Sequence, residues 1–231
     1  NALGLARNAQ ALKDAGLDRV NVSLDTVRSD TFHEITRRDR FPDVVAGLAA
    51  AQAAGLGPVK VNAVLLRGVN DDEAPELLAW CLEHGYELRF IEQMPLDAQH
   101  GWRRDEMVTA DEILAALEEH YVLVPAIEPR GSAPAELFLV DGGPATVGII
   151  ASVTRPFCGA CDRVRLTADG QIRNCLFARE ESDLRTAMRA GASDADLADR
   201  WLAAMATKKP GHGIDDPSFL QPERPMSAIG G

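Results

Sequence analysis

The sequence lacks any apolar run long enough to span a bilayer, and no signal peptide is visible at its start, so we expect a cytoplasmic protein without membrane contacts. Basic residues are scarce: 24 Lys and Arg face 35 Asp and Glu, for a net charge of −11. Nucleic-acid binding needs a basic surface, so the charge disfavours that class of function. Only four cysteines are present, and the clustering of three of them favours metal ligands over a disulfide framework.

A methionine is also missing from the first part of the chain. The sequence begins at Asn1 and its first methionine is Met94, so a natural start before residue 94 is not expected. We therefore interpret the chain as a fragment without its N-terminal part. Its 231 residues are enough for one large domain or two small ones with a full core.

Strands and helices alternate through the first half of the chain. Strands are predicted over 19–25, 59–66 and 86–93, with helical segments between them, and a capping box of Thr109 and Glu112 opens a further helix. This order is typical of βαβ units and a parallel sheet. Ligands of such sheets bind at the carboxyl ends of the strands.

From about Tyr121 the pattern changes to short β-like runs separated by turns that contain Pro or Gly. We therefore expect a division into residues 1–120 and residues 121–231. An Ala-Asp-Gly turn at 168–170 predicts a β-hairpin, and two predicted helices follow it, the first at 180–190.

The stretch from Arg155 to Arg179 concentrates the unusual chemistry of the chain. It holds Cys158 and Cys161, separated by two residues, and Cys175, which the predicted hairpin would bring back beside them. Five arginines lie in the same stretch, against two acids. We therefore predict a soft-metal site next to a positively charged pocket that suits one small anion.

Three cysteines fit an iron–sulfur cluster better than a structural zinc ion. Zinc takes four protein ligands, and the nearest histidine, His212, lies 37 residues beyond Cys175. A cubane cluster with three protein ligands would leave one iron open for a substrate. Arg163 and Arg165 alternate along a strand, so both can face one phosphate. The alternatives are a zinc site and three reduced structural thiols beside solvated arginines.

The stretch from Phe157 to Gly170, F-C-G-A-C-D-R-V-R-L-T-A-D-G, resembles the C-terminal cluster motif of the GTP 3′,8-cyclases of molybdenum-cofactor biosynthesis, which are radical S-adenosylmethionine enzymes. The resemblance covers essentially the whole chain. Other segments agree with that family in order and spacing, namely R-V-N-V-S-L-D at 19–25, V-K-V-N-A-V at 59–64, R-G-V-N-D-D at 67–72, R-F-I-E-Q-M-P at 89–95 and the terminal Gly-Gly.

This resemblance implies an α/β fold: a partial parallel (β/α) TIM-like barrel of the radical S-adenosylmethionine type, truncated at its N-terminus, with an α+β C-terminal region. The barrel would occupy residues 1–120, and residues 121–231 would form an iron–sulfur and substrate-binding region. The implied reaction converts GTP to (8S)-3′,8-cyclo-7,8-dihydroguanosine 5′-triphosphate, the first step of molybdenum-cofactor biosynthesis. A radical derived from S-adenosylmethionine would start it.

The resemblance also implies roles for particular residues. The ligands of a 4Fe–4S cluster that meets the guanine of GTP would be Cys158, Cys161 and Cys175. The residues that match GTP contacts are Lys60, Arg89, Arg163, Val164 and Arg165. The residues that match S-adenosylmethionine contacts are Ser23 and Met94, and a tail thought to reach into the active site is matched by Gly230 and Gly231.

One family feature is absent from this sequence: the N-terminal C-x₃-C-x₂-C motif, which holds a second 4Fe–4S cluster. We therefore expect the intact protein to be the enzyme and this chain to be inactive alone. The implied partners are GTP, S-adenosylmethionine, a downstream cyclic pyranopterin monophosphate synthase and a second copy of the chain in a homodimer. The alternatives are a zinc-stabilised binding module and a non-catalytic homologue.

Overall fold

The computed structural model describes residues 1–229, so the predicted tail residues Gly230 and Gly231 lie outside the described part of the chain. The described residues form two compact units. Unit 1 comprises residues 1–93, 106–130 and 135–154, and unit 2 comprises residues 94–105, 131–134 and those from 155 onward. Among the helices described, none has both the length and the apolar character needed to cross a membrane.

Unit 1 is built on a six-stranded sheet with the order β1-β2-β3-β6-β5-β4. The first four strands of that order pair in parallel, which confirms the predicted parallel sheet, and the last two pair antiparallel. The strands are β1 (Asn21–Ser23), β2 (Lys60–Ala63), β3 (Glu87–Ile91), β4 (Leu123–Pro125), β5 (Glu136–Val140) and β6 (Thr146–Ile150).

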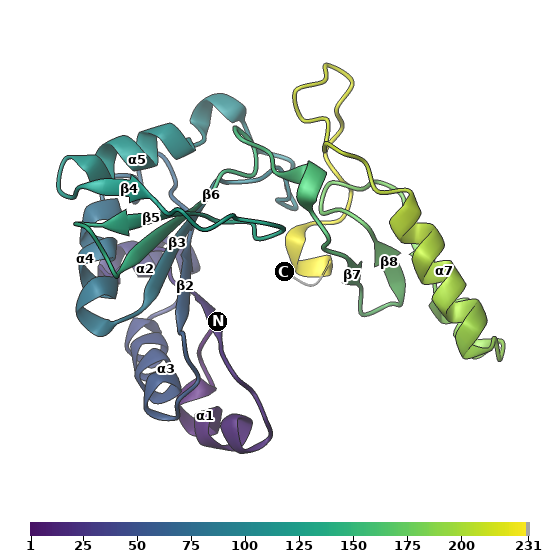
Figure 1. Ribbon diagram of the computed structural model, residues 1–231, viewed down its shortest axis with the longest axis horizontal. Coiled ribbons are helices and arrows are strands. Elements are labelled where there is room, and N and C mark those ends of the chain that lie inside the picture. Colours follow the sequence, from purple (N-terminus) through teal and green to yellow (C-terminus); the bar gives the residue numbers. More distant parts are fainter. Residues whose placement is uncertain (230–231) are drawn as a thin grey trace. The chain divides into compact units, whose positions relative to one another are not determined.

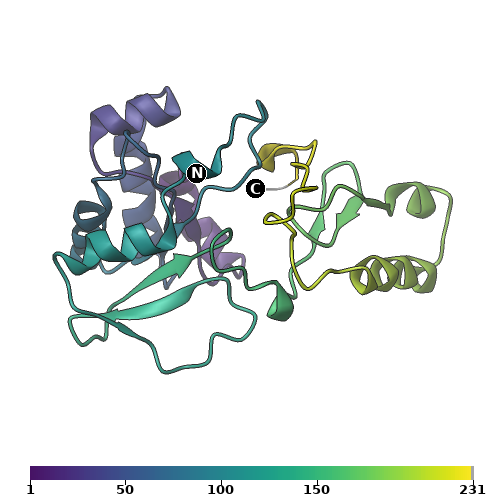
Figure 2. The same cartoon turned by 90° about the horizontal axis from the view of Figure 1, so that it is seen from above.

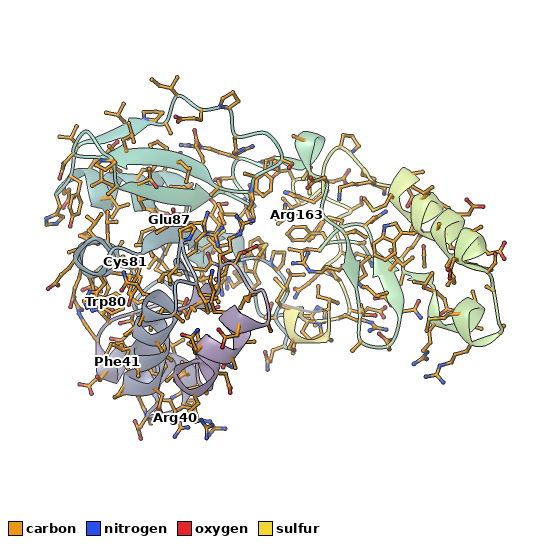
Figure 3. The ribbon with its side chains drawn as sticks, turned by 60° about the horizontal axis from the view of Figure 1, so that its bottom comes forward. Arg40, Phe41, Trp80, Cys81, Glu87 and Arg163 are labelled. Atoms are coloured by element: carbon orange, nitrogen blue, oxygen red, sulfur yellow. The ribbon has the colours of Figure 1, made fainter. Side chains whose placement is uncertain are left out.

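Five helices belong to unit 1, and their apolar sides form one core with the sheet (Figures 1 and 2). They are α1 (Leu5–Asp14), α2 (Ser29–Thr36), α3 (Phe41–Ala53), α4 (Ala74–His84) and α5 (Ala110–Glu118). The predicted capping box before α5 is confirmed: the Thr109 side chain accepts from the Glu112 backbone N–H, and the Glu112 carboxylate accepts from the Thr109 N–H. Cys81 in α4 is labelled in Figure 3, and its thiol belongs to the fully buried core.

The sheet of unit 1 takes in residues from well beyond Tyr121. Strand β6 pairs in parallel with β3, from Leu88 opposite Val147 to Ile91 opposite Ile150. The compact units therefore divide the chain elsewhere than at residue 120, because the pairing of β6 with β3 draws residues 135–154 into the sheet. A functional division between residues 1–120 and 121–231 is a separate matter and stays a prediction.

A buried carboxylate joins three segments of unit 1. Glu92 follows β3 directly and is only 1% exposed. It accepts hydrogen bonds from the backbone N–H groups of Ala110, Val153 and Thr154, and from the Thr154 hydroxyl. Since buried carboxylates are tolerated when such donors surround them, Glu92 ties the start of α5 and the segment after β6 to the end of β3.

Unit 2 contains a small antiparallel sheet of three strands, β7 (Arg165–Leu166), β8 (Gln171–Arg173) and β9 (Ser182–Asp183). The β7–β8 pairing confirms the predicted hairpin. Gly170 lies in its turn with φ +80, and an added Cβ there would lie 2.5 Å from the Cβ of Arg185. Both the left-handed backbone and the close neighbour therefore require glycine.

The helical elements of unit 2 lie before and after this sheet. They are the 3₁₀ turn η2 (Cys158–Ala160), α6 (Arg185–Arg189), α7 (Asp194–Ala206) and the 3₁₀ turn η3 (Met226–Ala228), and a further 3₁₀ turn, η1 (Arg104–Glu106), lies where the chain passes to unit 1. The helix predicted at 180–190 is wrong in its first half. Ser182 and Asp183 pair with β8 instead, and the Asp183 carboxylate accepts from the Thr186 N–H at the start of α6.

Candidate active site

The three clustered cysteines are carried by the hairpin region of unit 2. Cys158 begins the turn η2, Cys161 follows that turn, and Cys175 comes two residues after β8. All three are free thiols and are half-buried. The β7–β8 pairing places Arg173, two residues before Cys175, opposite Arg165, four residues after Cys161, as the predicted hairpin requires.

The thiols do not form a site for a single metal ion. Within the described residues, no three side chains of His, Cys, Asp or Glu are grouped closely enough to hold one ion. The assignment of Cys158, Cys161 and Cys175 as ligands of one metal centre therefore stays a prediction.

The pKa values of Cys158 and Cys161 are shifted in opposite directions. Burial raises the pKa of Cys158, and the neighbouring thiol of Cys175 raises it further, although the backbone N–H of His212 acts in the opposite direction. Burial alone would also raise the pKa of Cys161. There the hydrogen bond and positive charge of Arg163 outweigh burial, with a smaller contribution from Lys208, so the pKa of Cys161 lies below its usual range.

Arg163 is tied directly to the cysteine stretch. Its Nε donates to the Sγ of Cys161 at 3.3 Å, and its guanidinium carbon lies 4.8 Å from the centre of the Phe157 ring (Figure 3 labels Arg163). A thiolate neighbour and an aromatic face are both favourable surroundings for a cation. The predicted link between the positive charge and the sulfur site is therefore present in the structure.

Arg165 and Arg173 face each other across the hairpin but have different surroundings. Burial lowers the pKa of Arg165, and the positive charge of Arg163 lowers it further. Arg173 is 2% exposed and is held by the Glu181 carboxylate at 2.5 Å and by the carbonyl oxygens of Leu176 and Ala178. Arg173 thus stabilises the loop around Cys175.

Val164 lies between Arg163 and Arg165 in the sequence and is half-buried. It immediately precedes β7, which begins at Arg165. Its role as a GTP contact stays a prediction.

One face of the unit 1 sheet is polar, which is unusual for parallel strands, because their faces are normally apolar on both sides. Strand alternation places apolar residues on the helix-covered face, where Val22, Val61, Leu88, Phe90, Val147 and Ile149 are buried. Apart from Ile91 at the end of β3, the residues of the opposite face are polar in the first three strands. They are Asn21, Ser23, Lys60, Asn62, Glu87 and Arg89.

Arg89 is held on this polar face by two amides. Its Nε donates to Oδ1 of Asn62 and its Nη2 donates to Oδ1 of Asn21, each at 2.9 Å. Both acceptors are neutral, so these bonds orient the guanidinium without cancelling its charge. Burial lowers the pKa of Arg89, and the negative charge of Glu87 acts against that shift.

The side chain of Arg89 also depends on the residue opposite it on β6, which is Gly148. A Cβ added at Gly148 would lie 2.9 Å from Cγ of Arg89 and 3.2 Å from Cβ of Ala135. Such distances are shorter than van der Waals contact, so the absence of a side chain at position 148 leaves the space that Arg89 occupies.

Of the remaining predicted residues, Lys60 begins β2, Ser23 ends β1, and Met94 lies three residues beyond the end of β3. The Nζ of Lys60 is 3.0 Å from the Glu87 carboxylate, so this lysine is paired in the structure. Ser23 is exposed at the end of β1. Met94 belongs to unit 2, is half-buried, and its carbonyl accepts from the Leu96 N–H at 2.8 Å.

Four residues that touch the predicted site residues were not predicted from the sequence. Asn21 and Asn62 had a usable signal, since both alternate with buried residues on strands. Gly148 and Lys208 had none, because each acts through a contact with a residue far away in the sequence.

Comparisons with known proteins cover both halves of the chain. The family model described as Molybdenum Cofactor Synthesis C matches residues 86–214, and the model of the Radical SAM superfamily matches residues 1–81. A protein named GTP 3′,8-cyclase from Streptomyces coelicolor is 67% identical over an alignment of 232 positions, which covers all of this chain and 68% of the relative. Proteins of the same name from Mycobacterium sp. strain KMS and Mycolicibacterium smegmatis are 65% and 63% identical.

The chain spans about two thirds of the length of these relatives, with 66% and 65% of the last two covered. Sequence identities of 67%, 65% and 63% over the whole chain indicate membership of one family and not only a shared fold. They agree with the motifs of the cysteine stretch. This chain belongs to the GTP 3′,8-cyclase family of radical S-adenosylmethionine proteins.

Proposed function

We propose that this chain provides GTP binding for a GTP 3′,8-cyclase, which converts GTP to (8S)-3′,8-cyclo-7,8-dihydroguanosine 5′-triphosphate at the first step of molybdenum-cofactor biosynthesis. The relatives carry that name. The observation that carries the proposal is the hydrogen bond from Arg163 to Cys161, which joins the sulfur ligands to the arginines of the same hairpin region.

The three thiols suit a 4Fe–4S cluster. In a cubane each cysteine binds a different iron, so the thiols need not meet at one ion, and the neighbouring thiols of Cys158, Cys161 and Cys175 are free. The lowered pKa of Cys161 favours the thiolate that iron binds. With three protein ligands, such a cluster would offer an open iron to the guanine of GTP.

The cationic side chains suit the triphosphate. The family resemblance supports Arg163, Arg165, Lys60 and Arg89 as GTP contacts, together with Val164. A guanidinium offers paired donors to phosphate oxygens, and partial burial strengthens each such bond. Holding the substrate in one orientation is what a radical reaction at a single C–H bond needs from the protein.

Other parts of the function rest on family membership. We propose that Ser23 and Met94 contact S-adenosylmethionine, which supplies the radical. We also propose that the parallel sheet of unit 1 is part of a (β/α) barrel. A cytoplasmic location, a homodimer and a downstream cyclic pyranopterin monophosphate synthase as partner complete the proposal.

The experiment is anaerobic reconstitution of the chain with iron and sulfide, followed by GTP titration. We expect a brown protein with about four irons per chain. Arg163→Ala and Arg165→Ala should each weaken GTP binding by roughly 1.5–3 kcal/mol, the value of a hydrogen bond to a charged group. Arg179→Ala, at an exposed position of the same stretch, is the matched control.

Three results would contradict the proposal or a part of it. Tight, colourless zinc binding with no iron uptake would favour a zinc-stabilised binding module. Full iron uptake with the same GTP affinity in all the arginine variants would remove the triphosphate assignment while leaving the cluster in place. A brown protein that fails to bind GTP at all would favour a non-catalytic homologue.

A further inference from the structure

Lys208 joins the two segments of unit 2 that carry the cluster cysteines. Its Nζ donates to the carbonyl oxygen of Arg163 at 2.7 Å and to the carbonyl oxygen of Asn174 at 2.5 Å. The side chain is half-buried, whereas the neighbouring Lys209 is exposed. Two carbonyl contacts of this length are charge-assisted hydrogen bonds, which are stronger than neutral ones.

The position of these two carbonyls in the hairpin gives the contact its importance. The β7–β8 pairing reaches Arg165 opposite Arg173 and does not include Arg163 or Asn174. Arg163 follows Cys161 by two residues, and Asn174 immediately precedes Cys175. The ammonium group of Lys208 therefore connects the segment before β7 with the segment after β8. It does so just beyond the last paired residues of the hairpin, where the segments that carry Cys161 and Cys175 begin.

The end of α7 holds Lys208 in this place. Nδ2 of Asn174 donates to the Ala204 carbonyl at 3.1 Å and to the Thr207 hydroxyl oxygen at 2.8 Å. The segment before Cys175 is thus bound to the last turn of α7, and the residue that follows this turn reaches back to the hairpin. The contacts are reciprocal, so they fix the distance between helix and hairpin.

We propose that Lys208 is a positioning residue for the iron–sulfur site: it holds the Cys161 and Cys175 segments together so that both thiols can bind one cluster. This inference rests on the proposed cluster.

The first test measures how firmly the cluster is held. Lys208→Met, Lys208→Arg and Lys209→Met are prepared in the full chain and reconstituted anaerobically, and the decay of cluster absorbance is followed after a chelator is added. We expect Lys208→Met to lose its cluster on the order of tenfold faster than wild type, the effect of about one charge-assisted hydrogen bond. Lys209→Met should match wild type, and Lys208→Arg should recover part of the loss.

A second test works without any cluster. A short reagent with two thiol-reactive ends is added to the cluster-free chain, and Cys161–Cys175 cross-links are counted by mass spectrometry. We expect fewer cross-links in Lys208→Met than in Lys209→Met, with the same thermal midpoint in both. Equal cross-linking overturns the positioning role. If wild type takes up no iron but cross-linking still depends on Lys208, the proposed cluster fails and the bridging contact stands.

Discussion

The Nε of Arg163 lies 3.3 Å from the Sγ of Cys161 and lowers the pKa of that thiol against the effect of burial. This bond has a direct chemical consequence. A thiol reacts as its thiolate, and a nearby cation increases the thiolate fraction at neutral pH. Cys161 should therefore be the more reactive member of its pair with Cys158, whose pKa burial raises.

The first prediction concerns this pair. In the cluster-free chain, Arg163→Met should move the pH profile of Cys161 alkylation to higher pH, because the cation that favours the thiolate is gone. Mass spectrometry of the labelled peptides, recorded over a pH series with Arg179→Met as control, measures the shift. An unchanged Cys161 profile would show that Arg163 does not set its pKa.

The second prediction concerns Gly148 and Arg89, which oppose each other on β6 and β3. Arg89→Ala should weaken GTP binding by roughly 1.5–3 kcal/mol, as expected when a charged hydrogen-bond donor is lost. Gly148→Ala should weaken binding in the same direction, because its Cβ would collide with Cγ of Arg89.

The double variant separates positioning from general damage. Once Arg89 is alanine, the added Cβ at position 148 no longer meets the arginine side chain, so Gly148→Ala should cost little further GTP affinity. Gly4→Ala, where the added Cβ would meet only the Asn8 amide at 3.5 Å, is the control. Additive losses in the double variant would argue against a contact between the two positions.

The third prediction concerns thiol reactivity. Burial raises the pKa of Cys81 to about 12, so at pH 8 only about one molecule in ten thousand carries its thiolate. Three thiols of the folded, cluster-free chain should react with a colorimetric thiol reagent, and the fourth should react only after denaturant is added. Cys81→Ala should remove that late fraction alone. A fourth thiol that reacts as fast as the others would mean that α4 opens readily.

The fourth prediction concerns Glu92. Glu92→Gln replaces one acceptor oxygen by an NH₂ group that would face backbone N–H donors, and a buried group left without its partner costs about 1–3 kcal/mol. The free energy of unfolding, measured in urea, should fall by that amount. Glu83→Gln on the exposed side of α4 is the control and should stay close to wild type. Equal stability of the two variants would show that the carboxylate network adds nothing.

The fifth prediction is a pH dependence. Burial raises the pKa of Asp25 above its ordinary 3.8, although the Val64 N–H favours the charged form. The folded state therefore holds this proton more tightly than the unfolded state, so the contribution of Asp25 to stability is largest below the unfolded pKa and is lost as pH rises through the folded pKa.

Asp25→Asn removes that charge and can still accept from Val64. The variant should be more stable than wild type near neutral pH, and the difference should close as pH falls toward the ordinary pKa of an aspartate. Urea unfolding of both proteins across this range measures it. A difference that stays constant with pH would show that Asp25 does not titrate in the folded chain as its burial suggests.

Local patterns in the sequence were enough to predict much of this molecule. The order of strands and helices through residue 93 predicted a parallel sheet, the Thr109 capping box predicted the start of α5, and the Ala-Asp-Gly turn predicted the β7–β8 hairpin. These features depend on residues within a few positions of one another. The family resemblance, confirmed by the comparisons, came from short motifs of the same kind.

What failed or was missed depends on pairing between distant residues. The first half of the helix predicted at 180–190 is not helical, because β9 pairs with β8 there. The change to short β-like runs near Tyr121 did not indicate that β6 would pair in parallel with β3. Strand pairing of this kind is decided by the hydrogen-bond partners that the fold makes available, which a local propensity cannot register.

The sequence by itself pointed to the side chains that we propose for the chemistry: three clustered thiols, Arg163 and Arg165 two positions apart, and, through the family resemblance, Lys60 and Arg89. The predicted strand through both arginines is shorter than expected, because β7 begins only at Arg165. Only the tertiary structure decided how these groups are held. Gly148 leaves room for Arg89, Asn21 and Asn62 orient it, and Lys208 bridges the Cys161 and Cys175 segments. The physical reason is that a residue type specifies a donor, an acceptor or a volume, whereas its partner is specified by the packing of segments far apart in the chain.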